Sequence, residues 1–258
     1  MADPLPISVV IITKNEERRL ADCLASVAWA VERIVVDDES TDRTVAIARE
    51  FGVKVLTRRM EIEGRHRNWA YAQATQPWVL SLDADERVSP ELAEELRQLF
   101  AAGPTCDAYT LPRRNYLGSH WLRYGGWYPS AQLRLFKRGV FQYEEAEVHP
   151  RAICDRRWGN LRGDLLHYSY RNVDDFIAKM NRQTTLEAQK WHRTGRKIGL
   201  GVALWRTVDR FVRAYVMKQG YRDGFPGFVA ALFGSWYQVL SYAKFWELQQ
   251  HDRRAARA

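Results

Sequence analysis

Four short runs of apolar, mostly β-branched residues alternate with helix-like segments in the first third of the chain. The runs cover residues 7–12, 34–36, 53–56 and 78–82. Apolar spacing predicts a helix over 17–27, an N-cap at 40–42 predicts a helix that ends at Phe51, and a further helix is predicted over 64–74. Strands that alternate with helices of about a dozen residues form βαβ units. We therefore expect an α/β fold, with a parallel sheet covered by helices on both faces.

Each apolar run ends in polar residues. These are the segments 13–16, 37–38, 58–59 and 83–86. In parallel sheets, ligands bind beyond the carboxyl ends of the strands, so these segments are expected to form one site. No Gly-x-Gly-x-x-Gly sequence follows the first run, and no Walker A sequence occurs. This argues against a dinucleotide-binding domain and a P-loop enzyme.

The segment from Leu80 to Glu86 places three carboxylates within four residues, directly after an apolar run. Asp83 and Asp85 are spaced so that they can converge on one hard cation, Mg²⁺ or Mn²⁺, which leaves other positions for water and phosphate oxygens. The alternative is a polar turn that precedes a helix beginning at Ser89-Pro90. With no glycine loop present, a metal at Asp85 could neutralise bound phosphates, helped by Arg65 and Arg67.

Four ordered motifs resemble those of the family 2 glycosyltransferases, which are inverting enzymes of the GT-A fold that use nucleotide-diphosphate sugars. They are Val-Val-Ile-Ile-Thr-Lys-Asn-Glu (9–16), Val-Val-Asp-Asp-Glu-Ser-Thr-Asp-Arg-Thr (35–44), Gly-Arg-His-Arg-Asn (64–68) and Leu-Asp-Ala-Asp-Glu (82–86). Glu39 stands where many members have glycine. The resemblance implies a GT-A-like, Rossmann-type fold with a mostly parallel sheet flanked by helices.

The resemblance also implies roles for residues at the first two strand ends. Thr13 and Glu16 would line the pocket for the base and ribose. Asp37 or Asp38 would accept a hydrogen bond from the uracil or from a ribose hydroxyl. The simpler alternative for Asp38 is that it caps the following helix.

Further roles follow for the later motifs. Arg67 and Asn68 would lie near the nucleotide and its phosphates, although Arg67 could instead belong to a solvated helix face. Asp83 would face the ribose or a metal-bound water, and Asp85 would ligate the metal and the pyrophosphate. His167 is a candidate late ligand of the metal or the pyrophosphate, with a packed, hydrogen-bonded histidine as the alternative.

The second half of the predicted catalytic domain is less regular. Residues 107–112 and 132–136 alternate apolar and polar, as half-buried strands do. Between them, 115–129 is rich in glycine and aromatic residues. Aromatic rings commonly form platforms for sugars, so this segment is a candidate acceptor loop, with a core-packing loop as the alternative.

An inverting transfer needs a general base for the acceptor hydroxyl. Glu147 is our first candidate and Glu145 the second, and the alternative is a set of solvated glutamates. The resembling enzymes often place an acid directly after a Val-His pair, but Pro150 occupies that position here.

The character of the chain changes after residue 171. We expect a catalytic domain over 1–171, with a nucleotide-sugar half (1–103) and an acceptor half (104–171), followed by a basic, aromatic helical tail over 172–258. A long polar helix is predicted from Asp174 to His192, and the stretch from Lys190 to Arg222 has nine Lys or Arg residues against one acid. Its aromatic and apolar stripe is typical of a helix lying on an anionic membrane.

Residues 225–243 carry no charge. Nineteen such residues approach the length of a span, but interspersed glycine, serine and glutamine lower their hydrophobicity. We predict an in-plane or shallowly inserted helix rather than a span. The alternatives are a helical pair packed on the catalytic domain and a dimer interface.

Charge and cysteine content add expectations about partners and location. A net charge of +8 suggests an anionic partner: nucleic acid, a phosphorylated substrate or an acidic membrane. Cys23, Cys106 and Cys154 show no metal or disulfide spacing, which suggests a reducing compartment. The first residues lack the features of an export signal, so we expect none.

With its basic tail, the chain is similar to lipopolysaccharide inner-core β-1,4-glucosyltransferases, which work on the cytoplasmic face of the inner membrane. The similarity implies a UDP-glucose donor, an acceptor heptose on a lipid-linked saccharide and peripheral attachment to the membrane. One rival is transfer to polyprenyl phosphate or another envelope glycan. Another is a membrane-docked nucleotide-sugar binding protein without turnover. A nucleic-acid binder is disfavoured, because the basic residues are interleaved with a membrane-like aromatic stripe.

Overall fold

The computed structural model describes residues 4–145 and 151–255. The chain divides into two compact units. The first unit contains residues 1–114 and 130–167, and the second contains residues 115–129 and 168–258. The candidate acceptor loop therefore belongs to the same unit as the helical tail.

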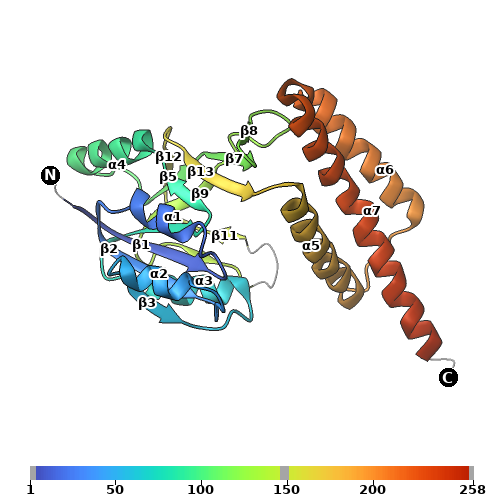
Figure 1. Cartoon of the computed structure of the whole chain (residues 1–258), viewed down its shortest axis with the longest axis horizontal. Helices are drawn as coiled ribbons and strands as arrows, with labels where there is room; N and C mark the ends of the chain where they lie inside the picture. Colours follow the sequence, from blue (N-terminus) through green and yellow to red (C-terminus); the bar gives the residue numbers. More distant parts are fainter. Residues whose placement is uncertain (1–3, 146–150, 256–258) are drawn as a thin grey trace. The chain divides into compact units, whose positions relative to one another are not determined.

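A seven-stranded sheet organises the first unit (Figure 1). Its spatial order is β12 (Trp158–Asn160), β6 (Ala108–Leu111), β9 (Gln132–Lys137), β4 (Trp78–Asp83), β1 (Leu5–Thr13), β2 (Ala30–Asp37) and β3 (Lys54–Thr57). Strands β1 to β4 run parallel, and only β9 runs antiparallel to its two neighbours. The predicted mostly parallel sheet is confirmed.

The strand register brings the predicted polar ends to one edge of the sheet. Thr13 at the end of β1 pairs with Asp37 at the end of β2, and Asp37 pairs with Thr57 on β3. On the other side of β1, Ile12 pairs with Asp83. The carboxyl ends of four consecutive parallel strands therefore meet, as the sequence predicts.

Helices cover both faces of this sheet. On one face, α1 (Leu20–Ser26), α2 (Thr44–Glu50) and α4 (Pro90–Ala102) pack on a core that includes Ile7, Val9, Ile11, Leu80 and Leu82. On the other face, α3 (Glu63–Ala72) packs on a core that includes Val10, Ile34, Val79 and Phe136. Alternate residues of β1 point to opposite faces, as the period of two in a strand requires. Helix α4 begins as predicted, because the Ser89 hydroxyl accepts from Leu92 N and Pro90 occupies the first helical position.

A second sheet includes the strand that follows the Asp-x-Asp turn. Its order is β5 (Glu86–Val88), β13 (Leu165–Tyr170), β7 (Arg113–Leu117) and β8 (His120–Leu122). Strand β13 is antiparallel to β5, and His167 pairs with Glu86. A short ladder between β10 (Gln142–Tyr143) and β11 (Ala152–Ile153) completes the strands.

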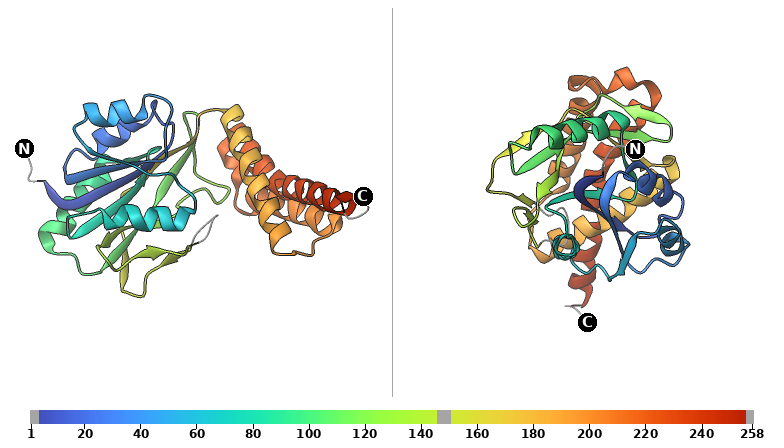
Figure 2. Two further views of the ribbon diagram at one scale, coloured as in Figure 1. Left: turned by 90° about the horizontal axis from the view of Figure 1, so that it is seen from below. Right: turned by 90° about the vertical axis from the view of Figure 1, so that its left-hand side faces the viewer.

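Three long helices form most of the second unit (Figure 2). These are α5 (Val173–Arg193), α6 (Leu200–Phe211) and α7 (Gly224–Ala255), and α7 packs against both of the others. A π-helical turn over Val212–Met217 and a 3₁₀ turn over Gly220–Asp223 connect α6 to α7. The predicted helix over 174–192 is confirmed as α5.

The inward face of α7 contains small and polar side chains as well as apolar ones. Ser235, Gln238 and Ser241 are buried, whereas Trp236 and Trp246 are exposed. Lys244 ties α7 to α5 by donating to Asn181 and to the hydroxyls of Thr184 and Thr185. Within the described ranges, no helix combines the length and apolar character that a membrane crossing requires.

Candidate active site

Asp83 lies between two arginines at the end of β4. Its Oδ1 accepts from Arg67 Nη2 on α3, and its Oδ2 accepts from Arg134 Nη2 on β9, both at 2.8 Å. Burial alone would raise the pKa of Asp83, but the two guanidinium groups hold it far below its ordinary value. Because both carboxylate oxygens accept hydrogen bonds from arginine, Asp83 is suited to fixing the turn rather than to binding a metal.

The Asp83–Glu86 turn contains a second buried carboxylate. Glu86 is 0% exposed, and its Oε1 accepts from Arg134 Nη2 at 3.0 Å. Its Oε2 accepts from the backbone N–H of Asp83 at 3.0 Å. Arg113 Nη1 lies 3.5 Å from the same Oε1. These contacts lock the turn that presents Asp85.

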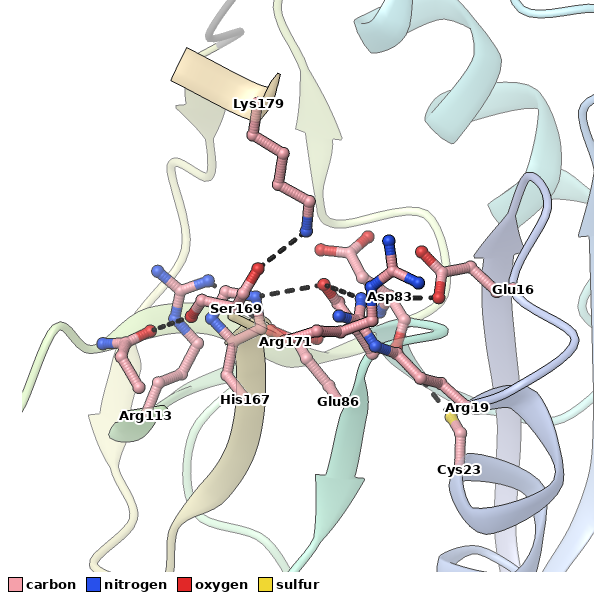
Figure 3. A network of polar contacts seen from close by, with 12 residues as sticks. Glu16, Arg19, Cys23, Asp83, Glu86, Arg113, His167, Ser169, Arg171 and Lys179 are labelled. Atoms are coloured by element: carbon pink, nitrogen blue, oxygen red, sulfur yellow. Dashed lines mark hydrogen bonds and ion pairs between the residues drawn. The ribbon is translucent and has the colours of Figure 1, made fainter. Parts of the chain in front are cut away.

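Asp85 faces a histidine and an arginine. Its Oδ2 lies 3.6 Å from His167 Nε2 on β13 and 3.6 Å from Arg19 Nη1, just before α1. Arg19 Nη1 also lies 3.4 Å from Glu16 Oε2. Figure 3 shows this network, with Glu16, Arg19 and Cys23 near Asp83 and with His167 on β13. The structure thus brings together Asp85 and His167, which are predicted as metal ligands.

The donor set at Asp85 fits a hard divalent cation. One carboxylate and one imidazole are both within reach of a common point, and Mg²⁺ or Mn²⁺ completes its coordination with water and substrate phosphates. In the part of the chain that the structure describes, no group of three or more His, Cys, Asp or Glu side chains could hold a metal alone. A cation here would therefore depend on ligands from the substrate.

The first two strand ends supply buried polar atoms that face no protein partner. Thr13 Oγ1 and Asp37 Oδ1 are buried and have no hydrogen-bond partner among the described residues. The other Asp37 oxygen accepts from Ser40 N at 2.9 Å. Buried polar atoms are nearly always satisfied, so this pair indicates a place for a polar ligand.

Asp38 is engaged differently. Its Oδ2 accepts from Lys14 Nζ at 2.9 Å and its Oδ1 accepts from Met60 N at 2.8 Å. Burial would raise the pKa of Asp38, but the contacts with Met60 and Lys14 lower it overall. Of the two candidates, the geometry favours Asp37 as the acceptor for a ligand and gives Asp38 a role in holding the neighbouring loops.

The loop after β1 is fastened to the loop after β2. Asn15 Oδ1 accepts from Thr41 N, and Glu16 N donates to Thr44 Oγ1, both at 2.8 Å. Glu39 has a φ of 51°, in the left-handed region that favours glycine. The turn therefore keeps the backbone conformation of a glycine position although the residue is glutamate.

Helix α3 joins the Asp-x-Asp turn to the segment that carries the base candidates. Arg67 contacts Asp83, and the Asn68 amide pairs with both backbone groups of Tyr143, at 2.9 and 2.8 Å. A Cβ at Gly64 would lie 1.8 Å from Glu144 O, so only glycine permits this close approach. Nucleotide contacts of Arg67 and Asn68 remain predictions, because their described partners are protein groups.

The residues matched by a family model decide the classification. The model for glycosyl transferase family 2 matches residues 8–158, which include all the strand ends described above. The chain belongs to glycosyl transferase family 2. It is a glycosyltransferase with a GT-A-like mixed α/β fold, as the motifs predict.

Two relatives that align with nearly the whole chain are also glycosyltransferases by name. The glycosyltransferase is 30% identical over 262 residues to "Lipopolysaccharide core biosynthesis glycosyltransferase LpsC" of Rhizobium meliloti (strain 1021), covering 99% of this chain and 96% of that one. It is 28% identical to "Uncharacterized glycosyltransferase RT0209" of Rickettsia typhi, with 96% and 89% covered. A solved structure, S. aureus TarS 1–349, is similar with a TM-score of 0.46 and 14% identity over 97% of this chain and 92% of that one.

The two base candidates of the glycosyltransferase differ in what the structure describes. Glu147 lies outside the described residues. Glu145 is described, its side chain is 57% exposed, and its Oε2 accepts from Arg65 Nη2 at 2.8 Å and from Arg65 Nε at 3.2 Å. Both contacts reach the same oxygen, so Arg65 fixes the orientation of the Glu145 carboxylate. The general base therefore remains a prediction.

Sequence reasoning missed two arginines of the glycosyltransferase site, Arg134 and Arg19. Arg134 is 2% exposed and lies within the otherwise apolar stretch from Leu133 to Phe136. A charged residue inside a buried strand needs a charged partner, and that was the available signal. Its partners are about fifty residues away in sequence, so the pattern alone could not name them.

Proposed function

We propose that this chain is an inverting, metal-dependent glycosyltransferase that moves a hexose, glucose from UDP-glucose, onto a heptose of the lipopolysaccharide core. The observation that carries the proposal is the pairing of Asp85 Oδ2 with His167 Nε2 at 3.6 Å, beside a turn fixed by two arginines. The similarity to LpsC along 99% of the chain supports the acceptor class.

Donor binding is proposed for the edge formed by β1 and β2. Thr13 Oγ1 and Asp37 Oδ1 are buried and lack protein partners among the described residues. A uracil N–H or a ribose hydroxyl can donate to the Asp37 carboxylate, and the Thr13 hydroxyl can donate or accept. Glu16, which follows the same strand, is proposed to border the ribose side of the pocket.

Asp85 and His167 are proposed to hold Mg²⁺ or Mn²⁺ with the donor pyrophosphate. The ion, when bound, would neutralise charge on the departing nucleotide diphosphate as a Lewis acid. Arg134 and Arg67 hold Asp83, so that the turn presents Asp85 in one orientation. Arg19 Nη1 supplies a positive charge 3.6 Å from Asp85 Oδ2.

The acceptor hydroxyl needs a base on the face of the sugar opposite the leaving group. We propose that Glu147 takes that proton as the hydroxyl oxygen attacks the anomeric carbon, with UDP as the leaving group. Glu145, whose Oε2 accepts from Arg65, is the second candidate. The candidate acceptor loop, 115–129, offers aromatic side chains for the acceptor saccharide.

We further propose that the protein acts at the cytoplasmic face of the bacterial inner membrane as a peripheral protein. Arg210 and Arg213 occur in the same helical segment as exposed Trp205 and Val208, α6 and its continuation, where Arg213 pairs with Asp209. Such a combination suits an anionic membrane surface, where a lipid-linked acceptor is located.

The test is release of nucleotide diphosphate from a panel of nucleotide sugars, with Mg²⁺ or Mn²⁺, and with or without a truncated lipopolysaccharide core. We expect release from UDP-glucose that requires both metal and core. Release that requires polyprenyl phosphate instead would keep the chemistry and overturn the acceptor. UDP binding without release under any acceptor would favour a binding protein that lacks turnover.

Asp85→Asn and His167→Gln test the metal site in the same assay. We expect a loss of about 100-fold or more in turnover for Asp85→Asn, because the ion contributes several kcal/mol. Calorimetric titration of Mn²⁺ in the presence of UDP gives a second readout. Asp107→Asn is the matched control, since Asp107 pairs with Lys137 away from these residues. Normal activity and Mn²⁺ affinity in Asp85→Asn would overturn the metal assignment.

A further inference from the structure

The turn between α6 and α7 exposes large apolar side chains. Met217 is 72% exposed and Phe225 is 74% exposed, and Tyr221 between them is also exposed. The exposed series continues back along α6 through Val212, Val208 and Trp205. Most of the large apolar side chains exposed in the described chain lie between residues 200 and 225. Contiguous exposure of this kind marks an interaction surface.

We propose that this turn, together with the loop over residues 120–129, forms a docking site for the phosphate groups of anionic phospholipids. The proposal deepens the membrane part of the proposed function and rests on it. The surface belongs to the second unit, and its ligand is the phosphate group of an anionic lipid. Figure 1 shows the segment after β8 beside the α6–α7 turn.

Three exposed cations rest against the 120–129 loop. The guanidinium of Arg123 lies 4.2 Å from the Trp121 ring centroid, and that of Arg222 lies 4.4 Å from the Tyr124 ring centroid. Lys218 lies over Gly126, where a Cβ would be 2.9 Å from its Nζ. All three side chains are exposed, and Arg222 Nη1 also donates to Gln219 Oε1 at 2.9 Å. Contacts of this kind hold the cations at the surface of the loop.

Acidic residues are nearly absent from the two segments that build this surface. Residues 108–143 contain no Asp or Glu, and residues 210–246 contain only Asp223. Asp223 is buried: its Oδ2 accepts from Tyr124 N at 2.9 Å, and its Oδ1 lies 3.9 Å from His120 Nε2. The carboxylate therefore serves to hold the two segments together, while the positive charges face outward.

The surface is built by close backbone contacts. Gly125 N donates to Lys218 O at 2.9 Å. A Cβ at Gly220 would lie 2.7 Å from Ala214 O, and one at Gly227 would lie 2.0 Å from Gly220 O. Glycine is required at both positions for the turn to close. The cations and apolar side chains are therefore preorganised, which lowers the entropy cost of docking.

An anionic bilayer is the partner that fits both the apolar side chains and the cations of this surface. Apolar side chains enter the boundary between headgroups and acyl chains, while Lys and Arg meet lipid phosphates at the level above. A protein partner would not require three cations around an apolar tip. The exposed series contains one further acid, Asp209, and its Oδ1 is already paired with Arg213 Nε at 2.8 Å. Charge complementarity therefore selects anionic lipid.

The test is co-sedimentation of the full chain with vesicles of phosphatidylcholine alone or with added phosphatidylglycerol. Lys218→Ser with Arg222→Ser should lower the partition coefficient on anionic vesicles roughly 25-fold, taking about fivefold for each cation. Met217→Ser with Phe225→Ser should lower binding to both kinds of vesicle. The matched controls are Arg156→Ser with Arg157→Ser, exposed cations in the first unit, and Trp236→Ser with Trp246→Ser on α7.

Folding and donor binding are followed in every variant by circular dichroism and UDP titration. Vesicle binding equal to the wild type in both turn variants would overturn the proposal, as would equal losses in the control variants. Loss of a dimer in gel filtration for the turn variants, with vesicle binding unchanged, would assign the surface to a second copy instead. Transfer activity is a separate readout: normal lipid docking without any sugar transfer would overturn the proposed function and leave this inference standing.

Discussion

Arg134 Nη2 on β9 donates to Asp83 Oδ2 on the neighbouring strand β4 at 2.8 Å. The same nitrogen lies 3.0 Å from Glu86 Oε1, so one buried guanidinium neutralises both ends of the Asp83–Glu86 turn. Burial alone would lower the pKa of Arg134, but Glu86 and Asp83 raise it well above its ordinary value. The charge is thus permanent, and the turn depends on it.

Replacing Arg134 by glutamine should therefore destabilise the first unit. Glu86 would be left buried with Arg113 at 3.5 Å as its remaining arginine contact. Breaking a buried pair costs about 3–5 kcal/mol in the free energy of unfolding. Urea denaturation at pH 7 measures this loss, and Arg134→Lys should recover part of it. A loss below about 1 kcal/mol in Arg134→Gln would show that the pair is not important for stability.

Asp37 and Asp38 should respond differently to removal of their charge. Asp37→Asn weakens a hydrogen bond to the ligand, so we expect UDP affinity to fall about 10- to 100-fold, as for a bond to a charged group. Asp38→Asn loses the ion pair with Lys14 and should mainly lower stability. UDP titration and urea denaturation of both variants separate the two roles. Equal losses of UDP affinity would contradict this division.

Glu39→Gly should stabilise the protein. Glu39 has a φ of 51°, and a left-handed conformation costs an L-residue about 1–2 kcal/mol, part of which glycine recovers despite its greater freedom in the unfolded chain. We expect a gain of about 0.5–1 kcal/mol, seen as a higher denaturation midpoint. Glu39→Ala is the control and should bring no such gain. A destabilised glycine variant would mean that the glutamate side chain has a role of its own.

His66 should make stability depend on pH. Burial lowers the pKa of His66, with Asp38 partly opposing this, so the folded state favours neutral imidazole. The unfolded chain therefore takes up the proton first, and stability present at pH 7.5 is lost as the pH falls below about 6.5 toward the folded pKa. His66→Gln should remove this component, of at most about 1.4 kcal/mol per pH unit. Identical pH profiles for wild type and variant would refute it.

Local patterns predict the parallel half of the fold well. The runs over 7–12, 34–36 and 78–82 are apolar because both faces of their strands are buried, and that leaves a clear signal. The position of β9 in the sheet could not be predicted from local patterns. Its residues 132–136 read as a half-buried strand, but nothing local indicates that it lies antiparallel between β4 and β6. Such pairing depends on contacts between residues far apart in sequence.

The site was predictable where a motif carries it and not where only packing does. Asp85 follows from a motif, and His167 was proposed only through family resemblance, eighty-two residues later. Arg134 belongs to no motif, and its role is apparent only from the residues that it contacts. For α7, the uncharged stretch over 225–243 did not identify the packed face, because Ser235 and Ser241 are buried there. Small residues let helices approach closely, and a hydrophobic pattern does not reflect that property.

The Asn68 amide holds the peptide of Tyr143 rather than its side chain. The anchor therefore specifies a position in the chain and not an amino-acid type. Residues beyond 143 can change in sequence while their starting point stays fixed relative to α3. Substitutions after residue 143 would therefore change the side chains that follow this anchor, while the contacts that fix the Asp83–Glu86 turn stay as they are.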